Sequence, residues 1–94
     1  MTFDGRGLSH QRYLVLLSSK PIGQQPHGRV WMVRGDAFMA GGNGEITTVT
    51  SIAGWLKTAD LLRQGPARAR GGFYLVPTGD GFSVLEEKLR GGVS

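Results

Sequence analysis

The sequence predicts an α+β domain in which one amphipathic helix, residues 51–64, packs on one face of a mostly antiparallel sheet of about five or six short strands. Short apolar segments alternate with glycine-rich turns along most of the chain, which is typical of strands joined by hairpins. A single segment carries its apolar residues at helical spacing. Because 94 residues leave room for one core, we expect one domain over residues 1–94.

Composition limits the class of protein. Hydrophobic residues make up 39% of the chain and charged residues 19%, a balance typical of a globular domain rather than of a disordered one. The chain has no cysteine, which excludes disulfides and thiolate zinc sites and favours a reducing compartment. The longest apolar run, residues 13–17, is far shorter than the roughly 20 residues that span a bilayer. We therefore expect a cytoplasmic protein with no membrane contact.

The first third of the chain predicts an arm, a strand and a loop. Residues 1–12 contain Gly5 and Gly7 and show no apolar period, so we expect a loose N-terminal arm. Residues 13–17 form a continuous apolar run, which favours a central strand covered on both faces, although so short a run also suits a buried helical turn. Residues 18–28 contain two prolines and are expected to form a long loop.

The next segments predict three neighbouring strands. Residues 30–33 and 37–40 are separated by residues 35–36, which suit a two-residue hairpin turn with glycine first. Residues 41–44, with sequence GGNG, form the strongest turn signal, because glycine and asparagine tolerate the positive φ of tight turns. Residues 45–49 are rich in β-branched side chains and are expected to return as a half-exposed strand.

The predicted helix is defined by one apolar stripe. Thr50 or Ser51 is expected to cap its start, and Gly65 followed by Pro66 is expected to end it. The stripe consists of Ile52, Trp55, Leu56, Ala59 and Leu62.

The C-terminal third predicts a hairpin and a tail. Residues 73–76 and 82–85 are expected to be strands joined by a five-residue loop, residues 77–81. Residues 86–90 would extend the last strand or form one helical turn, and residues 91–94 would be a frayed tail.

The residues that catalysis or metal binding would need are thinly distributed. His10 and His27 lie in loop segments with no carboxylate or second histidine at ligand spacing. The acidic residues are scattered over turns and polar positions, and no strained nucleophile motif surrounds the serines. We therefore expect a protein that is not an enzyme, with no catalytic residues, no cofactor and no metal ion.

Basic residues are the main candidates for binding. The formal charge of +4 and the pI near 10.1 favour anionic partners. One cation group lies on the predicted helix, at its end and in the linker after it, and another precedes the helix; if the two share a face, that face would track a nucleic-acid backbone. The candidate binding residues are Lys57, Arg63, Arg68 and Arg70, with Arg29 and Arg34 in support.

Aromatic residues offer a second kind of contact. Trp31, Phe73 and Tyr74 lie in predicted strands beside basic residues, where they would form either a stacking platform for single-stranded bases or part of the core. The helix followed by residues 72–85 has the order of a recognition helix and wing, but the sequence predicts no second helix upstream to complete that motif.

Two functions follow from these observations. The first is a small non-enzymatic regulatory or inhibitor-type protein that acts, through its basic surface, on nucleic acid or on a host nucleoprotein complex. The alternative is a phage or mobile-element inhibitor that docks on a host protein without touching nucleic acid, since tryptophan and arginine are favoured interface anchors. An exposed sheet edge would also permit a homodimer.

Overall fold

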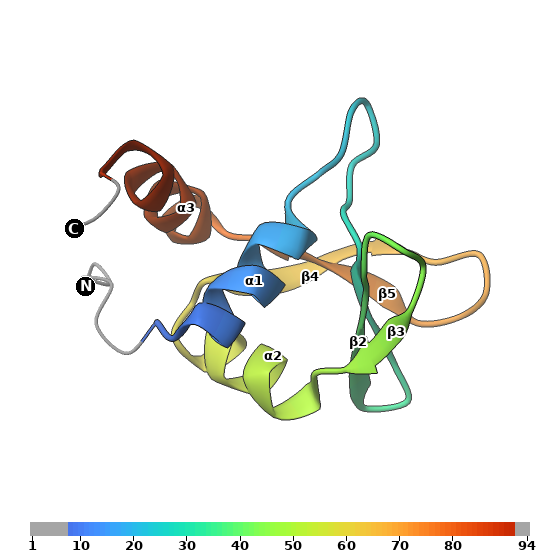
Figure 1. Ribbon diagram of the computed structural model, residues 1–94. Coiled ribbons are helices and arrows are strands. Elements are labelled where there is room, and N and C mark those ends of the chain that lie inside the picture. The colour runs from blue at the N-terminus through green and yellow to red at the C-terminus, as the bar shows by residue number, and fades with distance from the viewer. Residues whose placement is uncertain (1–7, 92–94) are drawn as a thin grey trace.

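The computed structural model describes residues 8–91. Within this range the strands form one five-stranded antiparallel sheet with the order β3-β2-β1-β5-β4 (Figure 1). The predicted α+β class, with a mostly antiparallel sheet, is confirmed. The elements in chain order are α1 (His10–Ser19), β1 (Val30–Val33), β2 (Asp36–Ala40), β3 (Ile46–Thr48), α2 (Thr50–Thr58), β4 (Leu62–Ala67), β5 (Phe73–Pro77) and α3 (Gly79–Gly91).

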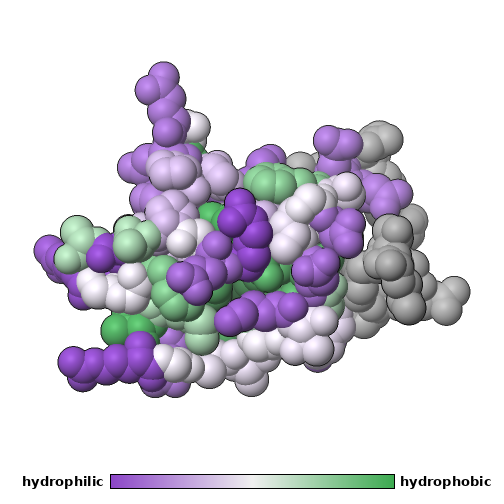
Figure 2. All heavy atoms as spheres, turned by 180° about the vertical axis from the view of Figure 1, so that it is seen from behind, coloured by the Kyte–Doolittle hydropathy of each residue, from purple (hydrophilic) through white to green (hydrophobic). Residues whose placement is uncertain are grey.

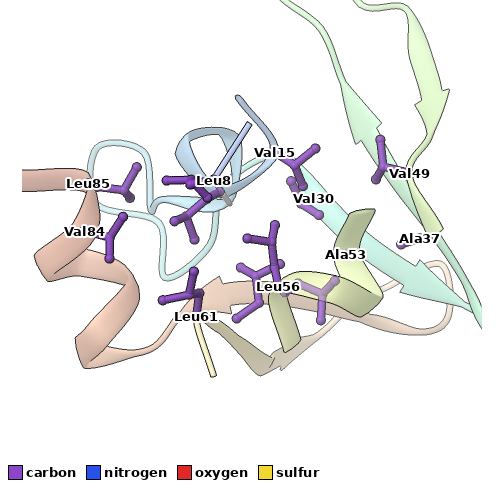
Figure 3. Close-up of a cluster of buried hydrophobic side chains, with 13 residues drawn as sticks. Leu8, Val15, Val30, Ala37, Val49, Ala53, Leu56, Leu61, Val84 and Leu85 are labelled. Atoms are coloured by element: carbon purple, nitrogen blue, oxygen red, sulfur yellow. The ribbon is translucent and has the colours of Figure 1, made fainter. Parts of the chain in front are cut away.

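Helices cover one face of the sheet. α1 packs on β5 and β1, and α2 packs on β2 and β4, so both lie on the same side (Figure 1). α3 contacts α1 and β5 and lies at one end of the sheet (Figure 1). The core fills the space between these helices and the sheet, where leucine and valine side chains from every layer meet (Figure 3). Leu16, Leu56 and Leu75, from α1, α2 and β5, are fully buried there.

Strand alternation divides the side chains between two faces. Val30 and Ala37 are fully buried and belong to the core cluster on the helix side. Their chain neighbours Trp31 and Phe38 point the opposite way, since successive side chains of a strand alternate between faces. No helix of residues 8–91 covers this second face, which we call the open face.

Residues 13–17 lie in α1, so the predicted central strand is wrong and the helical alternative holds. The Ser9 side chain accepts a hydrogen bond from the Arg12 backbone N–H at 3.3 Å and caps the helix. Leu8 is only 8% exposed and packs in the core, so the predicted loose arm is wrong from this residue onward. Residues 1–7 of that arm lie outside the described residues.

α2 ends at Thr58, six residues before the predicted end at residue 64, because Asp60 adopts a left-handed conformation with φ +62°. The Asp60 N–H donates to the Lys57 carbonyl at 3.0 Å, and the Leu61 N–H donates to the Leu56 carbonyl at 2.9 Å. These two bonds form a Schellman motif. The helix is also not capped by Thr50 or Ser51, because its N-cap is Val49, which makes no side-chain cap bond.

The chain after α2 also departs from the prediction. Residues 62–67, expected as helix end and linker, form the edge strand β4. Residues 82–85, expected as a strand, lie in α3, and residues 77–81 are therefore not a hairpin loop. Gly91 ends α3, and residues 92–94 of the predicted tail lie outside the described residues.

The short turns were predicted more accurately. Residues 41–44 connect β2 to β3 as expected, with the Gly41 N–H donating to the Glu45 carbonyl at 2.7 Å. The turn between β1 and β2 consists of Arg34 and Gly35, with φ of +54° and +85°, so glycine is its second residue and not its first. Positive φ at both residues is the pattern of a type I′ turn. Within residues 8–91, no helix is long and apolar enough to cross a membrane.

Candidate functional site

Three aromatic side chains form a row across the open face. The strand register places Phe38 of β2 opposite Trp31 of β1, and Trp31 opposite Tyr74 of β5. All three are half-buried, and the ring centroids of Trp31 and Phe38 are 6.2 Å apart. None of the three belongs to the core cluster or packs against it. We call Phe38, Trp31 and Tyr74 the aromatic row.

Arg68 places a cation over this row. Its Cζ lies 4.8 Å from the centroid of the Trp31 ring and 5.7 Å from that of Tyr74. The β4–β5 loop positions it, since the Arg68 N–H donates to the Gly72 carbonyl at 3.0 Å and its Nη1 donates to the Gly71 carbonyl at 3.1 Å. Cations are attracted to the face of an aromatic ring, which accounts for the position of the Arg68 guanidinium over the row.

His27 covers one end of the row. Its ring is stacked on Tyr74 with centroids 3.5 Å apart and planes at 2°. The Nδ1 atom donates to the Gly28 carbonyl at 3.0 Å. His27 lies in the loop that joins α1 to β1, and this loop projects beyond the body of the domain (Figure 1).

Two of the predicted binding residues flank the row on the open face itself. The Ala40 N–H donates to the Arg29 carbonyl at 3.0 Å, which extends the β1–β2 ladder and puts Arg29 on the same face as Trp31. Arg63 of β4 is paired with Val76, two residues along β5 from Tyr74, and therefore shares that face. Both arginines are exposed.

Two others border the row at the opposite end of the strands. Arg34 lies in the β1–β2 turn and Arg70 in the β4–β5 loop, and both are exposed. These loops meet, because a Cβ at Gly72 would collide with the Met32 carbonyl at the end of β1. The aromatic row thus has cations beyond both of its sides.

Lys57 is not brought together with the arginines. It lies on α2, and its Nζ contacts the Met32 Sδ at 3.9 Å on the helix side of the sheet. Phe73 is also separate from the row, because it packs against the core on the helix side. The sequence reasoning missed Phe38 and His27. The turn predicted at residues 35–36 would pair Trp31 with Ala40, and only the observed turn at Arg34 and Gly35 pairs Trp31 with Phe38.

Figure 2 shows the molecule from the side opposite to that of Figure 1, which is the side of the open face. Long hydrophilic side chains lie over and between hydrophobic and near-neutral ones on this side (Figure 2). Asp36 and Glu45 are acidic residues at the strand ends, and the Asp36 carboxylate accepts a hydrogen bond from the Thr50 hydroxyl at 3.2 Å. The row itself consists of aromatic side chains, with the Arg68 guanidinium over two of them.

The helix side offers a different surface. A pocket of about 290 Å³ lies between α1, β2, β3 and α2, and its lining includes Leu14, Met39, Thr47 and Ile52. None of its lining residues is ionisable, so the pocket brings no acid or base toward a ligand. Within residues 8–91, no group of three or more histidine, aspartate or glutamate side chains could hold a metal ion.

Comparisons of the chain with protein-family models, with curated proteins and with solved structures found no match.

Proposed function

We propose that the protein binds single-stranded nucleic acid through the open face of its sheet. The observation that carries this proposal is the alignment of Phe38, Trp31 and Tyr74 in one row across three strands. Bases of a single strand stack on aromatic side chains, and each stack contributes about 1–3 kcal/mol with little dependence on sequence. Aromatic residues on the central strands of a sheet are a known platform for two or three unpaired bases.

The spacing of the row suits this ligand. Neighbouring strands lie about 4.8 Å apart, so three adjacent strands span roughly 10 Å, which is room for two to three bases. Arg29 and Arg63 on one side of the row, and Arg34 and Arg70 on the other, can contact the phosphates on either side of the stacked bases. A duplex would not fit, because its base faces are already stacked on each other.

Binding of this kind needs no catalytic group, and it would let the domain regulate nucleic-acid-handling machinery by occupying its single strands. The alternative of docking on a host protein uses the same side chains, since tryptophan, tyrosine and arginine are also interface anchors. The two functions differ in whether a bare oligonucleotide binds and whether salt weakens that binding.

The test is fluorescence anisotropy of a labelled oligothymidylate of about ten nucleotides. Trp31→Ala should weaken binding by about five- to a hundredfold, because a stack is lost. Trp55→Phe is the matched control, since Trp55 lies in α2 and packs against the core on the helix side. A Trp31→Ala variant that binds as tightly as the wild type would contradict the proposal, and so would a wild type that does not bind at low salt.

The contribution of charge to nucleic-acid binding is tested with a matched pair of variants. Arg63 and Lys57 are both exposed, but they lie on opposite sides of the sheet. If Arg63 contacts a phosphate, Arg63→Ala should reduce the slope of log K against log salt concentration by about 0.7, the value for one contact to a single strand. Lys57→Ala should leave that slope unchanged. Equal slopes for the two variants would show that Arg63 does not contact a phosphate.

A further inference from the structure

His27 lies where a base would stack on the aromatic row. Its ring is parallel to that of Tyr74 within 2°, and the centroids are only 3.5 Å apart. The two rings therefore lie face to face with little offset. Aromatic pairs prefer an offset or an edge-to-face arrangement, so this stack is weaker than the one that a larger base could form on the same ring.

Few interactions hold the loop around His27. Ile22 is 43% exposed, and residues 23–26 at the tip of the loop are all exposed. The Ile22 N–H donates to the His27 carbonyl at 3.2 Å, and the Gln25 N–H donates to the Ile22 carbonyl at 3.0 Å, so these bonds stay within the loop. A segment with few buried apolar contacts opens at low free-energy cost.

The base of the same loop is fixed. The Arg29 N–H donates to the Ser18 carbonyl at 2.7 Å. Gly28 is buried, and a Cβ at this position would collide with the Ser18 and Lys20 carbonyls. The loop can therefore move His27 off Tyr74 without displacing β1 or the end of α1.

Arg68 provides a second indication that the aromatic row is covered by the protein's own side chains before a ligand binds. Its Nε is buried and has no hydrogen-bond partner within the described part of the chain. Buried N–H groups are nearly always paired, above all in a charged group. A phosphate beside the row would offer an acceptor to this guanidinium once it turns away from Trp31.

We propose that His27 competes with a nucleobase for the face of Tyr74, so that the loop of residues 20–29 regulates the nucleic-acid site. This inference rests on the proposed function. In the free protein the histidine covers the end of the row, and an incoming base replaces it. The fraction of molecules with the loop open then sets the apparent affinity, because the apparent Kd is the intrinsic Kd divided by that open fraction.

The experiment is the same oligonucleotide titration with His27→Ala. Removing the competitor should tighten binding by about two- to tenfold, the range that corresponds to the loss of one aromatic pair. Gln24→Ala, in the same loop and exposed, is the matched control and should bind as the wild type does. Circular dichroism of both variants checks that they are folded. Unchanged or weaker binding by His27→Ala would overturn the inference.

A second measurement separates this inference from the proposed function. In the free protein, Tyr74 should shift the NMR signals of the His27 ring, because the two rings are stacked. Adding the oligonucleotide should abolish that shift. If the wild type binds and His27 stays stacked, the nucleic-acid function stands and the competition is overturned. If neither the wild type nor His27→Ala binds, both proposals fail.

Discussion

At the scale of single residues, whether a side chain lies in the core or in the site depends less on its type than on the face of the sheet to which it points. Val30 and Trp31 are adjacent and both hydrophobic, yet Val30 is fully buried in the core while Trp31 remains half-exposed on the open face. On β5, Phe73 and Tyr74 are both half-buried, but Phe73 packs against the core while Tyr74 lies on the open face. One residue of slip in either strand would exchange core and site, which is why register specifies the aromatic row.

Asp60 is a residue whose conformation does not suit its side chain. Its φ of +62° belongs to the left-handed region, where glycine is favoured. Asp60→Gly should therefore raise the free energy of unfolding by about 0.5–1 kcal/mol, measured by urea denaturation. Asp60→Ala keeps a Cβ and should give no such gain. A loss of stability in the glycine variant would show that the aspartate side chain contributes more than its strain costs.

Arg34 also has a positive φ, at the first position of the β1–β2 turn. Asparagine is preferred at this position of a type I′ turn, so Arg34→Asn should stabilise the domain by a few tenths to about 1 kcal/mol. The same variant should weaken oligonucleotide binding at low salt, because one cation beside the row is removed. Thermal unfolding and anisotropy measure the two effects. Tighter binding by the asparagine variant would contradict the assignment of Arg34 to the site.

At the scale of elements, Thr50 joins α2 to the strands. Its hydroxyl accepts a hydrogen bond from the Ala37 N–H at 3.1 Å and donates to the Asp36 carboxylate at 3.2 Å. Thr50→Val keeps the shape but leaves the Ala37 N–H without this partner, which should cost about 1–3 kcal/mol. Thr50→Ser keeps the hydroxyl and should recover most of that loss. Equal stabilities of the two variants, by urea denaturation, would show that the hydroxyl is not important.

The elements that the sequence mispredicts share a physical cause. Residues 13–17 are apolar at every position although Leu14 is 39% exposed in α1, so this run of little more than one helical turn shows no helical period and resembles a buried strand. Val84 and Leu85 are adjacent and both buried because they lie in the helix α3; in a strand, adjacent side chains would point to opposite faces. The edge strand β4 contains Gly65 and Pro66, both of which disfavour strands, and tertiary pairing with β5 overrides that preference.

Turns were easier to predict because their signal is local. The segment of residues 41–44 needs no long-range partner, and Gly44 adopts the positive φ of +88° that its composition predicts. Asn43 supports the same turn, since its side chain accepts a hydrogen bond from the Glu45 N–H at 3.2 Å. The strands on both sides of this turn were accordingly found at nearly their observed bounds.

At the scale of the whole molecule, the site is assembled from distant parts of the chain. Trp31 and Tyr74 were both candidates for a stacking platform, but only the pairing of β1 with β5 places them side by side. Phe73 was an equal candidate on sequence grounds, but side chains alternate along β5, so Phe73 packs against the core on the face opposite to Tyr74. Local patterns report which residues are aromatic or basic, whereas the face on which they meet depends on the order of the strands.

The two faces of the sheet therefore differ in chemistry. The helix side buries the core, and there the Arg12 guanidinium lies 4.0 Å from the ring centroid of Trp55. The open face presents the aromatic row with Arg68 above it. The two tryptophans of the chain thus lie on opposite sides of the sheet, and each reports on the face to which it belongs.

The most direct test of the central claim follows these two tryptophans in one NMR experiment. The indole N–H signals are recorded in ¹H–¹⁵N spectra while a single-stranded oligonucleotide of about ten nucleotides is added at low salt. Binding through the open face should shift or broaden the Trp31 signal and leave that of Trp55 in place. A shift of the Trp55 signal alone, or no shift of either signal, would contradict the account.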